Sequence, residues 1–271
     1  MSRTKWRYLD QSVSLVERSP LESFAMDDTL CHLVGSGQSS EIFRTWVHDH
    51  SVVLGIQDHR LPYLDEAVKV IEQAGYQPIV RNSGGLAVVL DSGVLNVSIV
   101  LSEKTNSVDI PAAYEIMVAF IKRLFPEAAN EIEAYEIVGS YCPGSYDLSI
   151  GGRKFAGISQ RRIRSGIAVQ IYLCIEGSGA KRAELIREFY NAGIQGTETK
   201  FSYPDIQPEV MASLSELIGA ELTVRETVAR IEAMLTTLGQ LNKNSLTVEE
   251  LKLYDYYLNR LIERNRKLLS E

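Results

Sequence analysis

The stretch that decides how this chain folds is Gly139–Asp147, which reads GSYCPGSYD, together with Gly151–Gly157, which reads GGRKFAG. Two adjacent glycines between β-rich runs predict a two-residue hairpin turn. Pairing across this turn would place Lys154 opposite Ser149, with Asp147 two positions further along the same face. The stretch therefore predicts a loop at the Pro-Gly pair that leads into an antiparallel hairpin.

Cys142 lies beside the Pro143-Gly144 turn, on a loop, where reactive groups tend to be accessible. Lys154 follows twelve positions later, and a cation near a thiol favours the thiolate, the form that attacks acyl groups. The alternative is a small buried hydrophobe, the usual environment of a free cysteine. In an ideal hairpin the strand from Ser149 back to Ser145 runs about 13 Å away from Lys154. Cys142 can meet Lys154 only if the Pro-Gly turn folds the loop back over the sheet.

Helices and strands around this stretch follow from hydrophobic periodicity. Apolar stripes predict helices over residues 21–34, 62–74 and 111–125, and Ser178 should cap a helix that runs to Ala192 and stops at Gly193. Short β-rich runs predict strands at Ile42–Val47, Val52–Gly55, Tyr135–Val138, Tyr146–Ile150, Lys154–Ser159 and Ile167–Ile175. Steady β-α alternation is absent, so we expect an α+β fold with a mixed, mostly antiparallel sheet flanked by helices.

A second glycine pair lies in the segment Arg81–Asp91, which reads RNSGGLAVVLD. The run Ala87–Leu90, the turn Asp91-Ser92-Gly93 and the alternating run Leu95–Ile99 predict a second hairpin. Glycines at 84 and 85 would let the backbone approach a ligand closely and would expose N–H donors. The alternative is a turn that merely needs positive φ.

The C-terminal part changes character, because from Pro208 onward the pattern is almost entirely helical. The segments Thr223–Glu226 and Thr247–Glu250 both read as capping boxes. We expect one domain over residues 1–240, with its core at about 37–240, and a C-terminal helical segment over 241–271. The polar link Gln240–Ser245 is the predicted hinge.

Composition indicates a soluble globular protein and excludes several function classes. The chain has 271 residues, 45% of them hydrophobic, and a net charge of 28 − 35 = −7. An acidic chain without a long basic run is a poor candidate for binding nucleic acid or an anionic membrane. Three cysteines without a C-x-x-C motif suit a reducing cytosol, and the N-terminus shows no signal peptide. We therefore expect a cytoplasmic protein.

Other polar clusters have less specific patterns. His48, Asp49, His50 and His59 match no familiar zinc spacing, so we expect no metal site. Cys31 and Cys174 lie in a predicted helix and strand and are expected to be structural. Five cations within twelve residues could protect a strand edge or dock an acidic partner, and both interpretations stand: Arg153, Lys154, Arg161, Arg162 and Arg164.

These motifs together resemble the lipoyl and octanoyl branch of the biotin/lipoate protein ligase superfamily. The resemblance covers most of the chain, from Ser23–Leu30 (SFAMDDTL) to Met211–Leu217 (MASLSEL), and is most specific over Gly139–Arg162, with Arg81–Asp91 second. It implies a mixed-sheet catalytic domain with an acyl tunnel floored by the Arg81–Asp91 hairpin. It also implies an acyltransferase of lipoate biosynthesis that uses no cofactor.

The resemblance also implies which residues act. A cysteine carries the acyl group in this branch, and Cys142 occupies its place in the Ser-Tyr-Cys-Pro-Gly-Ser-Tyr-Asp motif. Lys154 matches the lysine of the Gly-Arg-Lys-x-x-Gly motif, thought to favour the thiolate and to lie by the acyl carbonyl. The implied substrate-binding residues are Arg81, Ser83, Gly84, Gly85, Leu86, Leu90, Asp147 and Gly157.

The implied reaction moves an octanoyl or lipoyl group between two proteins through a thioester on Cys142. The donor would be a lysine of glycine cleavage H protein, and the acceptor a lysine on a lipoyl domain of a 2-oxoacid dehydrogenase. Three alternatives remain: an octanoyl-carrier-protein donor with the same cysteine chemistry, an ATP-dependent ligase, and a non-catalytic binder of lipoyl domains.

The sequence departs from lipoate ligases in the second motif, which typically reads R-R-x-x-G-G-G-x-V-x-H. Here Leu86 replaces the third glycine and Leu90 the histidine. Losing a polar group and a glycine where an adenylate would lie counts against ATP use. Leu86 and Leu90 should make the site more apolar, as an eight-carbon chain would favour.

Overall fold

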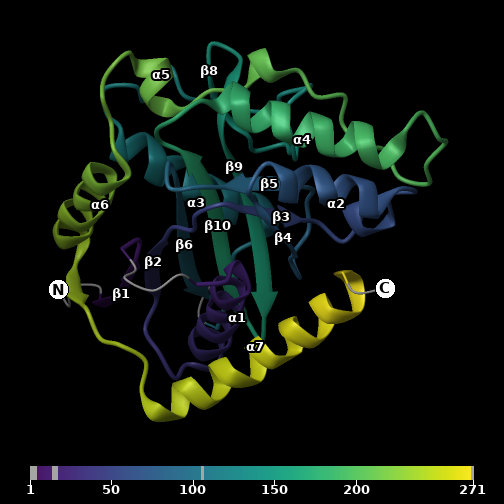
Figure 1. The fold of residues 1–271 in the computed structure, drawn as a ribbon. Coiled ribbons are helices and arrows are strands. Elements are labelled where there is room, and N and C mark those ends of the chain that lie inside the picture. The colour runs from purple at the N-terminus through teal and green to yellow at the C-terminus, as the bar shows by residue number, and fades with distance from the viewer. Residues whose placement is uncertain (1–4, 14–17, 105–106, 270–271) are drawn as a thin grey trace.

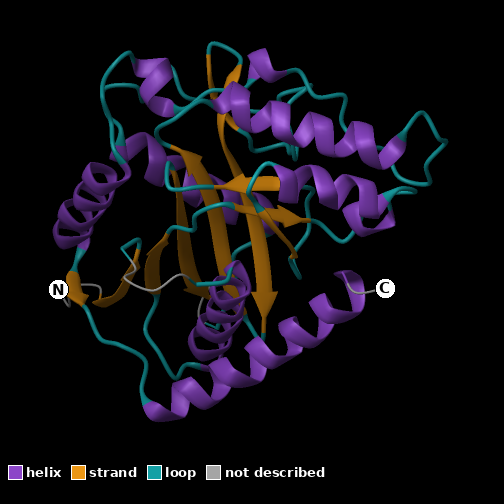
Figure 2. Ribbon diagram, viewed as in Figure 1, coloured by secondary structure: helices purple, strands orange, loops and turns teal. Residues whose placement is uncertain are grey.

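A large sheet with a smaller sheet beside it forms the centre of the molecule in the computed structural model, which describes residues 5–13, 18–104 and 107–269 (Figure 2). In spatial order the strands of the large sheet are β11 (Gln240–Asn242), β1 (Lys5–Gln11), β2 (Ile42–Trp46), β6 (Val94–Ser102), β10 (Gly166–Cys174), β9 (Arg153–Ile163), β8 (Leu148–Ile150) and β7 (Glu133–Ala134). The strands of the small sheet are β4 (Gln77–Val80), β3 (Ser51–Leu54) and β5 (Val88–Leu90).

Strand direction is mixed in both sheets. Strand β1 pairs in parallel with β2 and with β11, and the remaining pairings of the large sheet are antiparallel. In the small sheet β3 pairs in parallel with β4 and antiparallel with β5. The expected α+β fold with a mixed, mostly antiparallel sheet is therefore confirmed.

Helices cover the sheets on several sides (Figure 1). Helix α1 packs on β6, β9 and β10, and α7 packs on α1, while α3 contacts β9 and β10 and in turn contacts α6. Helices α2 and α4 pack together beside the small sheet. The helix bounds are α1 (Pro20–Ser36), α2 (Leu64–Gln73), α3 (Ile110–Leu124), α4 (Gly179–Ile194), α5 (Leu214–Ile218), α6 (Val224–Leu238) and α7 (Val248–Leu269).

Local sequence signals account for most element boundaries. Ser19 and Glu22 form a capping box at the start of α1, and Gly37 ends this helix in the left-handed region. The predicted capping boxes of α6 and α7 are confirmed by reciprocal hydrogen bonds between Thr223 and Glu226 and between Thr247 and Glu250. The predicted helices at 21–34, 62–74 and 111–125 correspond to α1, α2 and α3.

The two predicted hairpins have opposite outcomes. Gly151 and Gly152 both have positive φ, and Ser149 faces Lys154 across the turn, as predicted. The prediction of a hairpin between β5 and β6 is wrong. Asp91–Gly93 does form a tight turn, but β5 pairs with β3 in the small sheet. Both edges of β6 are occupied by β2 and β10, so β5 has no free edge of β6 to join.

Three other boundaries differ from the predictions. Helix α4 passes through Gly193 and ends at Ile194, with Gln195 as its cap, because Gly193 serves as a packing position against Leu61 rather than as a cap. Strand β7 is Glu133–Ala134 and not 135–138. The first residues of the predicted link form β11, which pairs with β1. The domain boundary at residue 240 stays a prediction.

Among the described residues, no helix is long and apolar enough to cross a membrane.

A buried ion pair joins α1 to the large sheet. The Arg44 guanidinium donates to Asp27 Oδ1 at 2.7 Å, and both side chains are 1% exposed. Asp27 Oδ2 also accepts from Ser98 Oγ on β6 and from Gln170 Nε2 on β10. Each buried polar group thus has a partner, which is the condition for tolerating charge in a core.

We predict that Asp27→Ala lowers the free energy of unfolding by about 3–5 kcal/mol, because it leaves a buried guanidinium without its counter-charge. Urea unfolding followed by circular dichroism measures the change. Lys69→Ala, which breaks the exposed Lys69–Glu66 pair, is the control and should leave the midpoint in place. An unchanged midpoint for Asp27→Ala would show that this ion pair does not stabilise the fold.

Candidate active site

Cys142 has a strained backbone at the end of a tight loop. Its φ is +45°, in the left-handed region that residues with a side chain rarely occupy. Its side chain is half-buried, whereas Cys31 and Cys174 are both 0% exposed. Strain at a partly accessible cysteine indicates function, since such a conformation persists only where its surroundings enforce it.

The sulfur of Cys142 receives two donors from the loop between β4 and β5. The Leu86 backbone N–H donates to Sγ at 3.2 Å, and Arg81 Nη2 lies 3.4 Å from Sγ. The same Nη2 donates to the Leu86 carbonyl at 2.7 Å, which closes the loop on itself. Hydrogen bonds from an N–H and a cation favour the negatively charged form of sulfur.

Glycines allow this close approach. Gly85 has φ +102°, and a Cβ at this position would lie 2.2 Å from Arg81 Nη2 and 3.0 Å from Cys142 Sγ. A Cβ on Gly55 would lie 1.9 Å from the Gly85 carbonyl oxygen. Any side chain at either position would push the loop away from the sulfur.

Lys154 approaches Cys142 from the backbone side. Its side chain is 0% exposed, and its Nζ donates to the carbonyl oxygens of Tyr141 and Cys142, each at 2.9 Å. It also forms an ion pair with Asp147 at 2.9 Å. The loop therefore does fold back over the sheet. The Lys154 ammonium lies at the carbonyl of Cys142, whereas the Arg81 guanidinium lies at its sulfur.

An apolar slot lies beside Arg81. Its cavity is small, about 40 Å³. An eight-carbon chain would enter only if lining side chains moved apart. The slot is lined by the predicted residues Arg81, Leu90 and Gly157 and by residues that we had not predicted, among them Phe24, Trp46, Val53, Val88 and Tyr172.

Two series of hydrogen bonds between side chains, one on each side, hold the Arg81–Leu86 loop in place. Asn82 donates to Asp28 on α1, which also pairs with Arg161 on β9. On the other side the Ala87 N–H donates to the Tyr190 hydroxyl, which donates to Asp58 Oδ1 at 2.8 Å. Sequence motifs gave no signal for Asp58 or Tyr190, because they lie far from the loop along the chain.

The other predicted loop residues have less defined roles. Gly84 is exposed, and Ser83 is buried, with no hydrogen-bond partner for its Oγ among the described residues. The structure thus gathers Arg81, Gly85 and Leu86 at the sulfur. It places Leu90 and Gly157 along the slot and Asp147 at Lys154.

Most of the histidine and cation clusters have structural partners. His48 hydrogen-bonds to the Arg18 carbonyl and to Ser23 Oγ, and burial lowers its pKa to about 4. In the described ranges no three or more Asp, Glu, His or Cys side chains gather as a metal site would need. Arg161 pairs with Asp28 and Arg162 with Glu103, whereas Arg153 and Arg164 are exposed. The docking of an acidic partner on this cluster stays a prediction.

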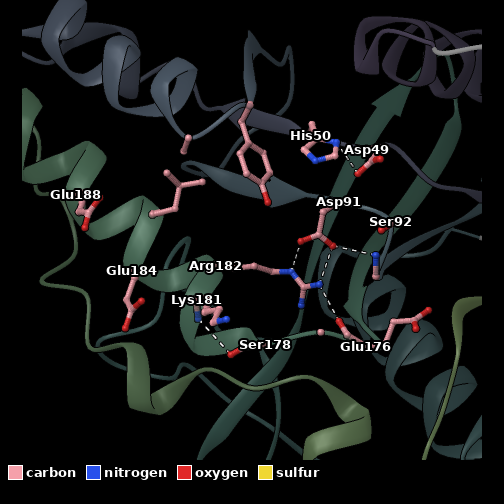
Figure 3. A pocket seen from close by; sticks show the side chains of 15 residues that line it. Asp49, His50, Asp91, Ser92, Glu176, Ser178, Lys181, Arg182, Glu184 and Glu188 are labelled. Atoms are coloured by element: carbon pink, nitrogen blue, oxygen red, sulfur yellow. Dashed lines mark hydrogen bonds and ion pairs between the residues drawn. The ribbon is translucent and has the colours of Figure 1, made fainter.

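A larger pocket lies elsewhere, beside Asp91, the residue that follows β5, and Figure 3 shows it from close by. It measures about 750 Å³, and Arg182 lies in its wall, paired with Asp91 through two hydrogen bonds of 2.7 Å. Its lining carries five carboxylates, from Asp49, Asp91, Glu176, Glu184 and Glu188. Five carboxylates suit neither a fatty chain nor a thiolate, so the candidate active site is the one at Cys142 and not this pocket.

Comparison with known sequences gives a consistent result. Residues 19–236 match the family described as lipoyl protein ligase A/B catalytic domain. A curated relative from Lysinibacillus sphaericus is 64% identical over 98% of this chain and 96% of its own length. One from Staphylococcus aureus is 47% identical over 98% of this chain and 95% of its own. Both relatives carry the name octanoyl-[GcvH]:protein N-octanoyltransferase.

Comparison with solved structures shows the same fold at low identity. A lipoate-protein ligase A bound with ATP superposes with a TM-score of 0.68 at 17% identity, covering 96% of this chain and 95% of the other. The bi-partite lipoate protein ligase of Thermoplasma acidophilum gives 0.65 at 17% identity, covering 99% and 98%. These likenesses confirm the ligase-like architecture.

We predict that Asp58 makes stability depend on pH. Burial raises the pKa of Asp58 from 3.8 to about 6, against the opposing hydrogen bonds from Gly55 and Tyr190 and the charge of Arg81. Between pH 4 and 6 the native state then binds more protons than the unfolded state, so stability falls as pH rises through this window. Asp58→Asn should abolish that fall and raise the free energy of unfolding at pH 7 by up to about 3 kcal/mol. Urea unfolding at several pH values measures it, and parallel curves for both proteins would contradict the prediction.

Proposed function

This chain belongs to the lipoyl protein ligase A/B catalytic domain family, and from that premise we propose that Cys142 carries its acyl cargo as a thioester. The protein is an acyltransferase that moves an octanoyl group from glycine cleavage H protein to acceptor proteins in lipoate biosynthesis. The observation that supports the cysteine step is the Cys142 sulfur, which is held by the Leu86 N–H and by Arg81, a residue that also lines the apolar slot.

In the first step the Cys142 thiolate attacks the carbonyl carbon of the octanoyl-lysine amide. A carbon–sulfur bond forms, the carbon–nitrogen bond breaks, and the lysine leaves as an amine. The proton that the leaving nitrogen needs balances the one that the thiol gave up on ionising. Backbone N–H groups of Gly84 and Gly85 are the donors that we assign to the oxyanion of the tetrahedral intermediate.

In the second step a lysine of the acceptor attacks the thioester. Its nitrogen replaces sulfur on the carbonyl carbon, the thiolate of Cys142 is regenerated, and the amine loses a proton. One lysine amide has been exchanged for another, so the overall reaction is near thermoneutral and needs no ATP. We propose that the acceptors are lipoyl domains of 2-oxoacid dehydrogenases.

Lys154 and Asp147 have a positioning role in this scheme. The Lys154 ammonium holds the carbonyls of Tyr141 and Cys142, and Asp147 accepts from the backbone N–H of Gly144 in the same loop. These contacts keep Cys142 at its positive φ, which aims the sulfur at the Arg81–Leu86 loop. Without the buried ammonium two carbonyl groups would lose their donor.

We predict that incubation with octanoylated H protein adds one octanoyl group to Cys142. Intact mass spectrometry should detect it, and hydroxylamine, which cleaves thioesters, should remove it. Cys142→Ser should lose the hydroxylamine-labile adduct and more than about a thousandfold of the transfer activity. Cys31→Ala, which changes a buried cysteine away from the site, should keep both.

The donor is tested in the same assay. Octanoyl carrier protein should label Cys142 far more slowly than octanoylated H protein does. If the protein forms a complex with a lipoyl domain but no hydroxylamine-labile adduct, the result would support a non-catalytic binder and contradict the transferase. An octanoyl adenylate formed from ATP would point to a ligase.

We predict that Gly157→Val reduces acylation by long chains selectively. A Cβ at residue 157 would lie 2.6 Å from Tyr172 Cε1, so the variant crowds two lining residues of the slot. With p-nitrophenyl esters as acyl donors, the preference for octanoyl over acetyl should fall about tenfold, because each buried CH₂ contributes roughly 0.8 kcal/mol. Alkylation by iodoacetamide should stay unchanged. An unaltered chain-length preference would remove this slot as the acyl site.

A further inference from the structure

The cation at the reactive sulfur comes from the Arg81–Leu86 loop. Arg81 Nη2 lies 3.4 Å from Cys142 Sγ, and the Arg81 side chain is only 7% exposed. By contrast, the Lys154 ammonium is engaged by Asp147 and by two backbone carbonyls. A guanidinium donates through a rigid planar group and keeps its charge when buried, so it can serve as a fixed donor to a thiolate.

The position of Arg81 depends on strand β4, which has an open edge. The Arg81 backbone N–H donates to the Leu54 carbonyl of β3 at 3.0 Å, on the inner side of β4. β4 pairs with β3 alone in the three-stranded sheet, so the outer peptide groups of its last residue, Val80, need another partner.

Asn265 of the C-terminal helix α7 provides that partner. Its Oδ1 accepts from the Val80 N–H at 2.7 Å, and its Nδ2 donates to the Val80 carbonyl at 2.8 Å. The side-chain amide thus pairs with Val80 as a neighbouring strand would. Asn265 is 7% exposed, and its Nδ2 also reaches the Leu261 carbonyl within α7. The helix is therefore joined to the residue that directly precedes Arg81.

We propose that Arg81 is a catalytic residue that stabilises the Cys142 thiolate, and that Asn265 is the positioning residue through which the C-terminal helix holds Arg81 in place. The proposal rests on Cys142 being the acyl carrier. It gives α7 a role in thiol activation in addition to its packing on α1.

The test measures the reactivity of Cys142 without any acyl donor. Alkylation by iodoacetamide is followed by peptide mass spectrometry over a range of pH, on the full chain. Arg81→Gln should slow alkylation of Cys142 at pH 7 by about tenfold or more, and the alkylation rate should begin to rise at a higher pH than in wild type. Arg81→Lys keeps a positive charge at this position and should therefore restore part of the rate. Arg225→Gln, at an exposed arginine on α6, is the matched control and should behave as wild type.

A second readout separates charge from structure. Iodoacetate is an anion, so a cation beside the sulfur raises its rate relative to that of neutral iodoacetamide. This ratio should fall in Arg81→Gln and stay in Arg81→Lys. Asn265→Ala should slow alkylation of Cys142 by about two- to tenfold, as expected for residues in one hydrogen-bond network. Asn191→Ala, at an exposed asparagine on α4, is its control.

Cys31 and Cys174 report on folding in the same digests, because both are 0% exposed. If Arg81→Gln makes Cys31 and Cys174 reactive, this variant has lost its fold. The test then rests on the iodoacetate-to-iodoacetamide rate ratio in Arg81→Lys and on the alkylation rate of Cys142 in Asn265→Ala. An unchanged pH profile in folded Arg81→Gln overturns the role of Arg81, and an unchanged profile in folded Asn265→Ala overturns that of the helix. Both results differ from failure of the transferase function, in which Cys142 stays reactive to iodoacetamide but accepts no octanoyl group.

Discussion

The contact between the Cys142 sulfur and the Arg81–Leu86 loop is the constraint on which the rest of the site depends. A thiol held by an N–H at 3.2 Å and a guanidinium at 3.4 Å needs two backbone segments to meet almost without side chains between them. Gly85 satisfies this need on one segment. On the other, Cys142 accepts a left-handed backbone, a strain that the buried Lys154 ammonium offsets by holding its carbonyl. The strained backbone of Cys142 and the contacts that hold it together fix the position of the sulfur, as is typical of functional sites.

The part of this arrangement that could be predicted rests on short-range rules. A Gly-Gly pair between β-rich runs sets the register of β8 and β9, and that register brings Lys154 opposite Ser149 and within reach of Asp147. Capping boxes and apolar stripes located the helices for the same reason, because cap and stripe lie within a few turns of one helix. The fold class and the reactive loop followed from these signals together with the family resemblance.

What could not be predicted is which distant segments meet. The turn after β5 is genuine, yet β5 joins β3, because the choice of partner depends on which strand edges remain free after the large sheet has formed. Asn265 lies 185 positions from Val80 along the chain, and a single amide near the end of an amphipathic helix has no pattern of its own. The slot residues Phe24, Trp46 and Tyr172 come from three separate elements, each with an ordinary core pattern.

The departures from the ligase motif acquire a physical meaning in this context. Beside these positions, Asn82 donates to Asp28 and ties the loop to α1. Leu90, where a histidine is typical, is 2% exposed and lines the slot. Leu86, where a third glycine is typical, presents its N–H to the sulfur. Each position that could meet an adenylate instead braces the loop, lines the apolar slot or holds the thiol. In the mechanism that we propose, such a site gains nothing from ATP, because the acyl group arrives already bound as an amide, and exchanging one amide for another requires only that the intermediate thioester be made accessible.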